Sequence, residues 1–584
     1  MSILNESLAT KISRFSISSE TSDHDLLPQD GLSYVRGPTN PQLVFATIPQ
    51  LLRDAVSRFG PRDAAVFCDS GIRMTYYDLD RAVDRLATGF LALGLNKGDR
   101  VGIWALNRHE WILTQFATAR IGLILVNINP AYRLSELEYA LNKVSCKALV
   151  LAKSFKTSEY LSMVRTLAPE MESCKPGQLQ AIKLPHLRNV IVMDENPGPG
   201  AYSVDHICKL GGPAQQLRLD KIDSSLSPDD PINVQFTSGT TGQPKGATLS
   251  HYNIINNARY VTDRIVLSEE DRLAIPVPLY HCFGMVMGVL GAVSKGAAMI
   301  FPGESFDATS TLDALEKEKC TALYGVPTMF VAMLQELDIK PRNLTRMRTG
   351  VMAGAPCPAD VMKRVNKDMN MPEVTICYGM TETSPVSFQS FVNDTTKQRC
   401  ETVGRVHPHL EVKVVDEGGN IVPVGKQGEL CTRGYSVMKG YWNDLDRTAD
   451  SIKDGWMHTG DLAVIDPEGF CSITGRVKDM IIRGGENIYP REIEEFLFTH
   501  PNVSEVQVFG IPDPKLGEEV CAWVIVRPDT TLDPAGLKDF CQGQIAHFKI
   551  PRHIRIVDEL PMTITGKPQK FVMRDQMIEL LGMS

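Results

Sequence analysis

The stretch Thr237-Ser238-Gly239-Thr240-Thr241-Gly242-Gln243-Pro244-Lys245-Gly246 carries four hydroxyl side chains, three glycines and one lysine. Glycine lets the backbone turn tightly and approach a ligand closely, and a turn of exposed N–H groups holds anions. The hydroxyls add donors, and the lysine adds a point charge suited to phosphate. We therefore predict a polyphosphate-binding loop, which differs from the common P-loop in its residue order. The alternative is a flexible surface turn.

The residues on either side of this stretch favour the binding loop. Residues 231–236 are typical of a short strand, and residues 251–258 are typical of a helix with Ser250 as its N-cap. A strand, a glycine-rich turn and a helix in this order form the usual setting of a phosphate site.

The stretch TSGTTGQPKG resembles the phosphate-binding loop of the adenylate-forming superfamily, which includes acyl-CoA synthetases, luciferases and the adenylation domains of peptide synthetases. The wider pattern, including VPTMF and YGMTETSP, is most similar to the medium-chain acyl-CoA synthetase branch. The resemblance implies an α/β fold, with a large N-terminal domain of two α/β subdomains plus a small β-barrel, followed by a small mobile α+β C-terminal domain. We expect a tail or arm over 1–45, the large domain over 46–477 and the small domain over 478–584.

The distribution of apolar residues along the chain agrees with this division. Residues 46–230 alternate helices with apolar strands, which predicts a parallel sheet covered by helices. A second α/β block is expected over residues 231–400, and short alternating strands over 401–475. The last hundred residues are typical of a compact α+β unit.

Composition limits the function classes. The chain has 584 residues, too many for one core, and its net charge of −8 without a basic stripe argues against nucleic-acid binding. Thirteen cysteines without a paired framework indicate reduced thiols inside the cell, with the cytoplasm favoured and a mitochondrial or peroxisomal location left open. The longest apolar stretch, residues 283–293, is too short to span a bilayer. No oligomeric state is predicted.

Further motifs imply the nucleotide contacts by resemblance. Tyr378-Gly379-Met380-Thr381-Glu382 resembles a motif in which the ring stacks on adenine, the threonine meets the α-phosphate and the glutamate holds Mg²⁺, a cation that prefers carboxylate oxygen. For Glu382 alone, the alternative is a solvated surface acid. Gly354-Ala355-Pro356 resembles the turn that lines adenine, and Asp461 and Arg476 resemble the ribose contacts. The predicted ATP- and AMP-binding residues are Thr237, Ser238, Gly239, Thr240, Thr241, Gly242, Lys245, Gly354, Ala355, Pro356, Tyr378, Gly379, Met380, Thr381, Asp461, Arg476 and Lys567.

The remaining motifs imply catalytic and channel residues. Lys567 matches the P-x-T-x-x-G-K pattern, and we expect it to bring a cation to the carboxylate and the α-phosphate together. Lys478 falls at the hinge between the domains, and Gly484 and Gly485 at the tunnel for CoA. His281 resembles a gate beside the acyl pocket. The predicted catalytic residues are Lys567, Thr381 and His281, and the predicted acyl pocket comprises Tyr252, His281, Val326, Gly354 and Met380. The alternatives are that Lys567 is a surface lysine, that Lys478 is a linker lysine without a special role, and that His281 is a core histidine with satisfied hydrogen bonds.

The resemblance implies an acyl-CoA synthetase that uses ATP, Mg²⁺ and CoA and acts on a carboxylic acid. An adenylate ligase that loads a carrier protein and a luciferase-like oxygenase share these motifs and stay open. A peptide-synthetase domain is disfavoured because too few residues follow Lys570 for a carrier domain. A degenerate nucleotide-binding scaffold is disfavoured because both Lys567 and Glu382 are present.

Overall fold

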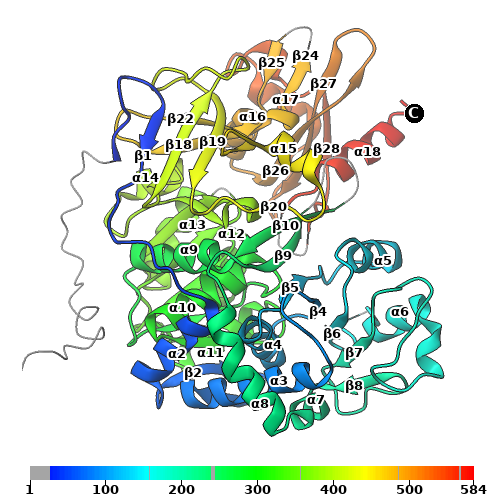
Figure 1. The fold of residues 1–584 in the computed structure, drawn as a ribbon. Coiled ribbons are helices and arrows are strands. Elements are labelled where there is room, and N and C mark those ends of the chain that lie inside the picture. The colour runs from blue at the N-terminus through cyan, green and yellow to red at the C-terminus, as the bar shows by residue number, and fades with distance from the viewer. Residues whose placement is uncertain are drawn as a thin grey trace, which may run out of the picture.

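The computed structural model describes residues 26–156, 158–237, 244–355, 357–483, 486–563 and 567–583. Figure 1 shows a large body with a smaller, orange-to-red body at its top. The strands of the described residues form four sheets, two of them large and mixed, one six-stranded and one five-stranded. This arrangement confirms the predicted α/β class, with a large N-terminal and a small C-terminal part.

The first large sheet has eight strands among the described residues, of which the six from β9 to β8 run parallel. In spatial order it contains β20 (Gly440–Tyr441), β10 (Lys245–Ser250), β9 (Pro231–Thr237), β5 (Ile124–Asn127), β4 (Arg100–Trp104), β6 (Ala148–Leu151), β7 (Asn189–Val192) and β8 (Ala201–Ser203).

The second large sheet has nine strands among the described residues and is parallel from β15 to β2. It contains β17 (Arg405–Val406), β16 (Val386–Gln389), β15 (Glu373–Gly379), β14 (Thr349–Ala353), β13 (Ala322–Gly325), β11 (Arg272–Ala274), β12 (Ala298–Phe301), β2 (Asp63–Phe67) and β3 (Ile72–Thr75).

Two expectations about these sheets were wrong. The chain does not complete one α/β block before it starts the next, because β2 and β3 join the second sheet while β9 and β10 return to the first. The glycine-rich stretch is followed by the strand β10, antiparallel to β9, and only then by the expected helix. Both errors have one cause: apolar periodicity indicates a strand but does not identify its neighbours.

The other two sheets are smaller. The six-stranded sheet takes the place of the predicted β-barrel and contains β1 (Tyr34–Arg36), β18 (Leu410–Val415), β19 (Gly428–Gly434), β22 (Trp456–Ile465), β21 (Ile452–Lys453) and β23 (Cys471–Arg476). Its strand β1 brings part of the expected N-terminal arm against β18. The small body contains β25 (Glu486–Ile488), β24 (Ile481–Arg483), β27 (Gly517–Val526), β26 (Val503–Asp513) and β28 (His553–Ile556).

Helices cover the two large sheets, and the small body carries its own (Figure 1). Those of the large body are α2 (Ile48–Phe59), α3 (Tyr76–Ala92), α4 (His109–Arg120), α5 (Leu134–Lys143), α6 (Tyr160–Leu167), α7 (Val204–Leu210), α8 (Pro213–Ile222), α9 (His251–Arg264), α10 (Gly291–Lys295), α11 (Ala308–Lys317), α12 (Pro327–Ile339), α13 (Ala359–Asp368), α14 (Thr396–Glu401) and α15 (Leu445–Ser451). The small body has α16 (Pro490–Phe498), α17 (Pro534–Cys541) and α18 (Lys570–Leu580). Ser250 caps α9 as predicted, since its hydroxyl accepts from the backbone of Asn253.

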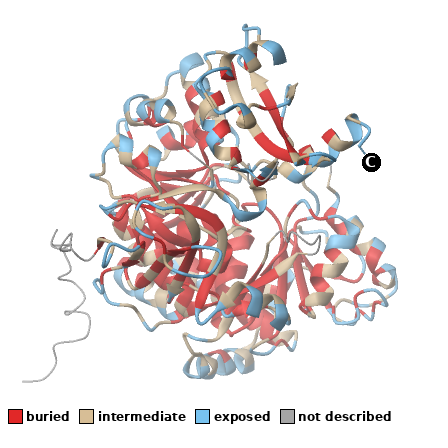
Figure 2. Cartoon of the chain, turned by 90° about the horizontal axis from the view of Figure 1, so that it is seen from above, coloured by how far each residue is buried: buried red, intermediate tan, exposed pale blue. Residues whose placement is uncertain are grey.

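The distribution of buried residues agrees with the arrangement of helices over the sheets. Figure 2 shows the buried residues concentrated on the central strands, with exposed residues on the outer turns. Strands β13 and β14 are buried along their whole length, as expected for parallel strands covered on both faces. The small body has a separate apolar core that includes Ile493, Val508 and Val524, so it is packed as a unit of its own.

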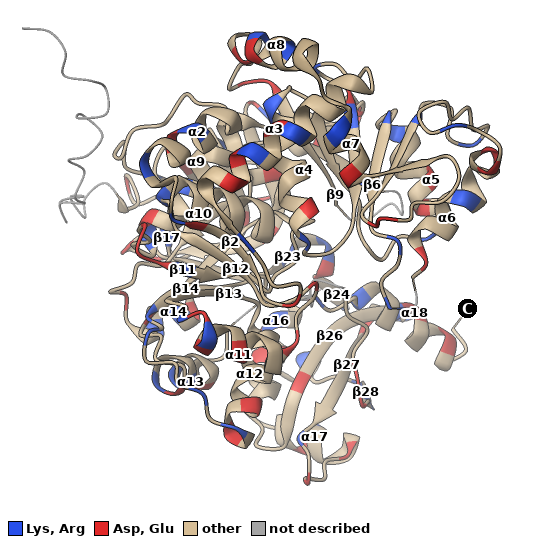
Figure 3. Ribbon diagram, turned by 90° about the horizontal axis from the view of Figure 1, so that it is seen from below, with Lys and Arg blue, Asp and Glu red and all other residues tan. Residues whose placement is uncertain are grey.

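In the view of Figure 3, basic and acidic residues are interspersed over the helices. Within the described part of the chain, every helix is too short or too polar to cross a bilayer.

Candidate active site

Glu382 lies where the predicted phosphate loop meets the end of β15. Parallel sheets bind ligands beyond the carboxyl ends of their strands, and Glu382 follows β15 in a single 3₁₀ turn. The residue is 6% exposed, and its Oε1 accepts from Thr237 Oγ at 3.2 Å and from the Tyr441 hydroxyl at 2.9 Å. Lys245 Nζ lies 4.8 Å from the centre of the Tyr441 ring. Both described ends of the loop therefore flank this carboxylate.

Tyr378, Asp461 and Arg476 form a second connected group. The Tyr378 hydroxyl donates to Asp461 Oδ2 at 2.5 Å, and Arg476 Nε donates to Asp461 Oδ1 at 2.9 Å. Asp461 and Arg476 are opposite each other on β22 and β23. Burial and the Asp461 carboxylate hold the pKa of Tyr378 well above its usual value, so this phenol stays a neutral donor. The group joins the predicted adenine and ribose contacts.

Two glycines bring the backbone close to this site. Gly354, directly after β14, has a φ of +94°, and a Cβ there would lie 3.3 Å from Val326 Cγ1. A Cβ on Gly379 would lie 1.8 Å from the carbonyl oxygen of Pro385, a contact that no side chain tolerates. Each position therefore requires glycine for a different reason, one for conformation and one for space.

Ala355, Met380 and Thr381 complete the described motif residues. Ala355 is half-buried after Gly354, Met380 packs against the main apolar core, and Thr381 is buried beside Glu382. The nearby Cys282 thiol is buried, and burial raises its pKa to about 12.

Lys567 faces this group from the small body. The backbone of its loop is held by Lys567 N, which donates to Thr563 Oγ at 2.9 Å. The residue is exposed to solvent. Desolvation and the charge of Arg476 lower its pKa, while Asp461 and Glu382 oppose that shift. The two bodies thus bring the predicted catalytic lysine to the predicted metal and ribose residues.

His281 is within electrostatic reach of Lys567. Burial, helped by the Lys567 charge, lowers the pKa of His281 to about 3. Its Nδ1 accepts from the backbone N–H of Phe283 at 3.2 Å, which leaves the ring proton on Nε2. His281 is therefore a neutral imidazole with one defined donor.

A cavity of about 620 Å³ opens between the two bodies. Val326, from the predicted acyl pocket, and Thr563, from the lysine loop, both line it. Arg133 and Lys156 add positive charge and Glu304 adds negative charge to a wall that also has many apolar residues. The other predicted acyl-pocket residues, Tyr252, His281, Gly354 and Met380, are not among the described lining residues. The ring of Tyr252 packs instead against Phe45 and Tyr435.

The remaining predicted residues are the hinge lysine, Lys478, and eight residues outside the described ranges. Lys478 is exposed in a 3₁₀ turn, Val477–Asp479, between β23 and β24. The predicted residues that lie outside the described ranges are Ser238, Gly239, Thr240, Thr241, Gly242, Pro356, Gly484 and Gly485.

Tyr441 is a site residue that the sequence analysis missed. It holds Glu382 through its hydroxyl and lies beneath Lys245. The pair Gly440–Tyr441 forms a two-residue edge strand against β10, and so short a strand has no periodicity by which to find it.

Comparison with known proteins agrees with the geometry. Residues 52–442 match the family model described as AMP-binding enzyme, and residues 492–567 match AMP-binding enzyme C-terminal domain. YngI of Bacillus subtilis (strain 168) is 48% identical over 545 residues, covering 93% of this chain and 99% of YngI. The mitochondrial medium-chain acyl-CoA ligase ACSF2 of Bos taurus is 46% identical over 575 residues, covering 97% of this chain and 93% of the relative.

A solved structure extends the agreement to the fold. The anthranilate CoA ligase AuaEII, crystallised with anthranoyl-AMP, has a TM-score of 0.79 at 25% identity, covering 92% of this chain and 98% of that chain. The predicted superfamily and its two-part fold are confirmed.

Proposed function

We propose a substrate class and residue roles from the premise that this chain belongs to the AMP-binding enzyme family and is an AMP-forming acyl-CoA synthetase. Its co-substrates are ATP and CoA, and its other substrate is a small carboxylic acid. The proposed acid is a medium-chain fatty acid or a close analogue, as the name of the ACSF2 relative indicates for that protein.

The observation that carries the residue roles is the approach of Lys567 to Glu382, Asp461 and His281. In adenylation, an oxygen of the acid forms a bond to the α-phosphorus of ATP while the bond to the pyrophosphate oxygen breaks. Two anionic groups must meet, and a cation aimed at both lowers that barrier. Lys567 supplies this charge, and Thr381 meets the α-phosphate.

The nucleotide is held by groups on the two large sheets and on the six-stranded sheet. Tyr378 stacks on adenine, and Asp461 accepts from the ribose hydroxyls with Arg476 beside it. Lys245 and the glycine-rich stretch hold the β- and γ-phosphates. Glu382 suits Mg²⁺, because its buried carboxylate offers hard oxygen beside hydroxyl groups. When bound, Mg²⁺ would neutralise charge on the departing pyrophosphate.

His281 and Val326 are proposed to receive the acid. The neutral His281 offers its Nε2 proton to a carboxylate oxygen without placing a second full charge beside Lys567. Gly354 and Met380 border the same approach in this proposal.

CoA is proposed to enter through the 620 Å³ cavity. Arg133 and Lys156 suit its phosphates, while Pro278 and Met329 suit the less polar arm. In the second half-reaction the thiol sulfur forms a bond to the acyl carbon and AMP leaves. Movement of the small body about Lys478 would bring Gly484 and Gly485 to this passage.

Release of AMP and pyrophosphate, measured over a panel of carboxylic acids with and without CoA, tests this function. We expect both products and an acyl-CoA with medium-chain acids, the class that the name of the ACSF2 relative gives for that protein. A product found only on a carrier protein, or light emission without acyl-CoA, would favour the alternatives. No AMP with any acid, from folded protein, would refute the function.

The cellular location is also a proposal. We favour the inside of the cell, since all thirteen cysteines are free thiols. The cytoplasm is our first expectation and the mitochondrion, named for the ACSF2 relative, the second. Fractionation of cells that express the tagged full chain would distinguish them.

A further inference from the structure

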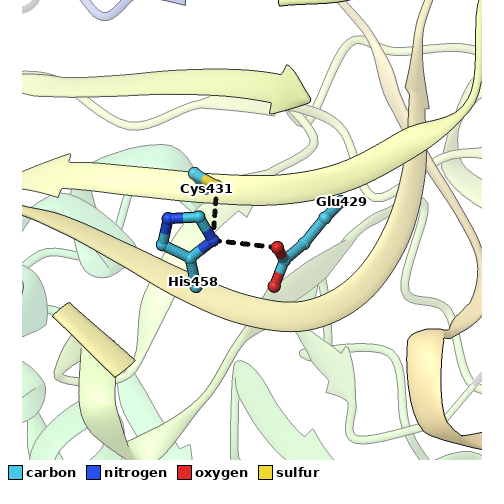
Figure 4. Close-up of side chains that lie close together, drawn as sticks. All are labelled: Glu429, Cys431 and His458. Atoms are coloured by element: carbon cyan, nitrogen blue, oxygen red, sulfur yellow. Dashed lines mark hydrogen bonds and ion pairs between the residues drawn. The ribbon is translucent and has the colours of Figure 1, made fainter. Parts of the chain in front are cut away.

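A second group of ionisable side chains lies on the six-stranded sheet. Figure 4 shows Glu429 and Cys431 from β19 converging on His458 from β22. Cys431 and His458 are direct cross-strand partners. Cys431 Sγ lies 3.5 Å from His458 Nδ1, which lies 2.8 Å from Glu429 Oε2. One ligand atom from each residue falls within 4.8 Å of the others.

These three atoms differ in kind from the Glu382 site. A thiolate, an imidazole nitrogen and a carboxylate oxygen are the donors that zinc takes, whereas Mg²⁺ takes oxygen. The site is also reachable, because the His458 and Glu429 side chains are 22% and 27% exposed while Cys431 is buried at the base. A cation can enter between the two exposed groups and keep a water in its fourth position.

We propose that Glu429, Cys431 and His458 bind a zinc-class divalent cation, and that its binding inhibits adenylation. Binding exchanges a proton for the metal: the Cys431 thiol releases its proton to solvent, and His458 binds through Nδ1 with its ring proton on Nε2. The metal then forms bonds to sulfur, nitrogen and oxygen. The inhibitory part rests on the proposed function, whereas the binding part does not.

One hydrogen bond connects the proposed cation site to the segment that carries the proposed ribose contact. The other oxygen of Glu429, Oε1, accepts from the backbone N–H of Gly460 at 3.1 Å. Gly460 precedes Asp461, which holds both Tyr378 and Arg476. A cation that turns the Glu429 carboxylate towards itself disturbs this contact and therefore the proposed ribose site.

Co²⁺ added to the full chain in excess Mg²⁺ tests the site, because a cobalt–thiolate bond gives a charge-transfer absorption. We expect one Co²⁺ per chain with this band, displaced by Zn²⁺. Cys431→Ser should lose the band and more than about tenfold in affinity, since even outer-shell changes cost 10–100-fold. Cys471→Ser is the matched control, a buried thiol on the neighbouring strand β23. His458→Gln gives a second variant if Cys431→Ser does not fold, as judged by circular dichroism.

The outcomes separate the two parts of the proposal. Absence of the band in the unmodified chain, or an equal band in folded Cys431→Ser, overturns the site. Zn²⁺ should slow AMP release by the unmodified chain and by Cys471→Ser, and leave Cys431→Ser unaffected. A cobalt band without inhibition by Zn²⁺ would refute the proposed effect of cation binding on adenylation. Failure of the proposed acyl-CoA synthetase function is distinguishable from failure of the cation site, because the cobalt band does not depend on enzyme activity.

Discussion

Replacing Lys567 by alanine tests the central role assignment. The substitution removes the ammonium that faces Glu382 and Asp461 across the two bodies. Arg476, the nearby cation, is already paired with Asp461 at 2.9 Å and is a poor substitute. Loss of one such transition-state contact costs about 2.7–4 kcal/mol, which corresponds to about 10²–10³ in the adenylation rate.

Single-turnover quench flow should measure the two half-reactions separately. Lys567→Ala should slow acyl-AMP formation by that factor, yet convert supplied acyl-AMP and CoA to acyl-CoA at close to the normal rate. Lys570→Ala is the control, because its ion pair with Glu494 at 2.6 Å lies within the small body. Unchanged adenylation in Lys567→Ala, or an equal fall in both half-reactions, would refute the assignment.

Three further results are expected. Glu382→Gln should raise the Mg²⁺ concentration needed for half-maximal AMP release by at least about tenfold, because an amide lacks the charge that hard cations prefer. Tyr378→Phe should raise KM for ATP by about 10-fold or more and leave kcat less affected, since a hydrogen bond to a charged group such as Asp461 contributes about 1.5–3 kcal/mol. His281, with a folded pKa of about 3, supports stability that is complete above its ordinary value of 6.5 and is lost as the pH falls towards 3. His281→Gln should therefore lose less unfolding free energy than the unmodified chain between pH 6.5 and pH 5, by up to about 1.4 kcal/mol per pH unit in urea titrations.

Local patterns in the sequence predicted the elements but not their neighbours. The strand β9 and the helix α9 with its Ser250 cap were predictable because periodicity and capping act over a few residues. The strand β10 was missed, and β2 was assigned to the wrong block. Pairing is decided by packing between segments far apart in the chain, as with β2 and β12.

The candidate site likewise contains residues that local sequence patterns predicted and partner residues that they did not predict. Glu382 and Asp461 were predictable because each stands in a recognisable string. Their partners were not: Tyr441 reaches Glu382 from an edge strand of two residues, and Cys431 meets His458 only through the register of β19 and β22. Contacts of this kind depend on which strands pair, and no local pattern encodes them.

The charges around Lys567 suggest why the two bodies would close and then part. Arg476 repels the Lys567 ammonium, and Asp461 and Glu382 attract it. Bound ATP adds several negative charges and favours the closed arrangement. Departure of pyrophosphate removes most of that charge and leaves two cations facing each other. We infer that this loss of attraction releases the small body after adenylation, and that the same groups which promote the first half-reaction make room for the second.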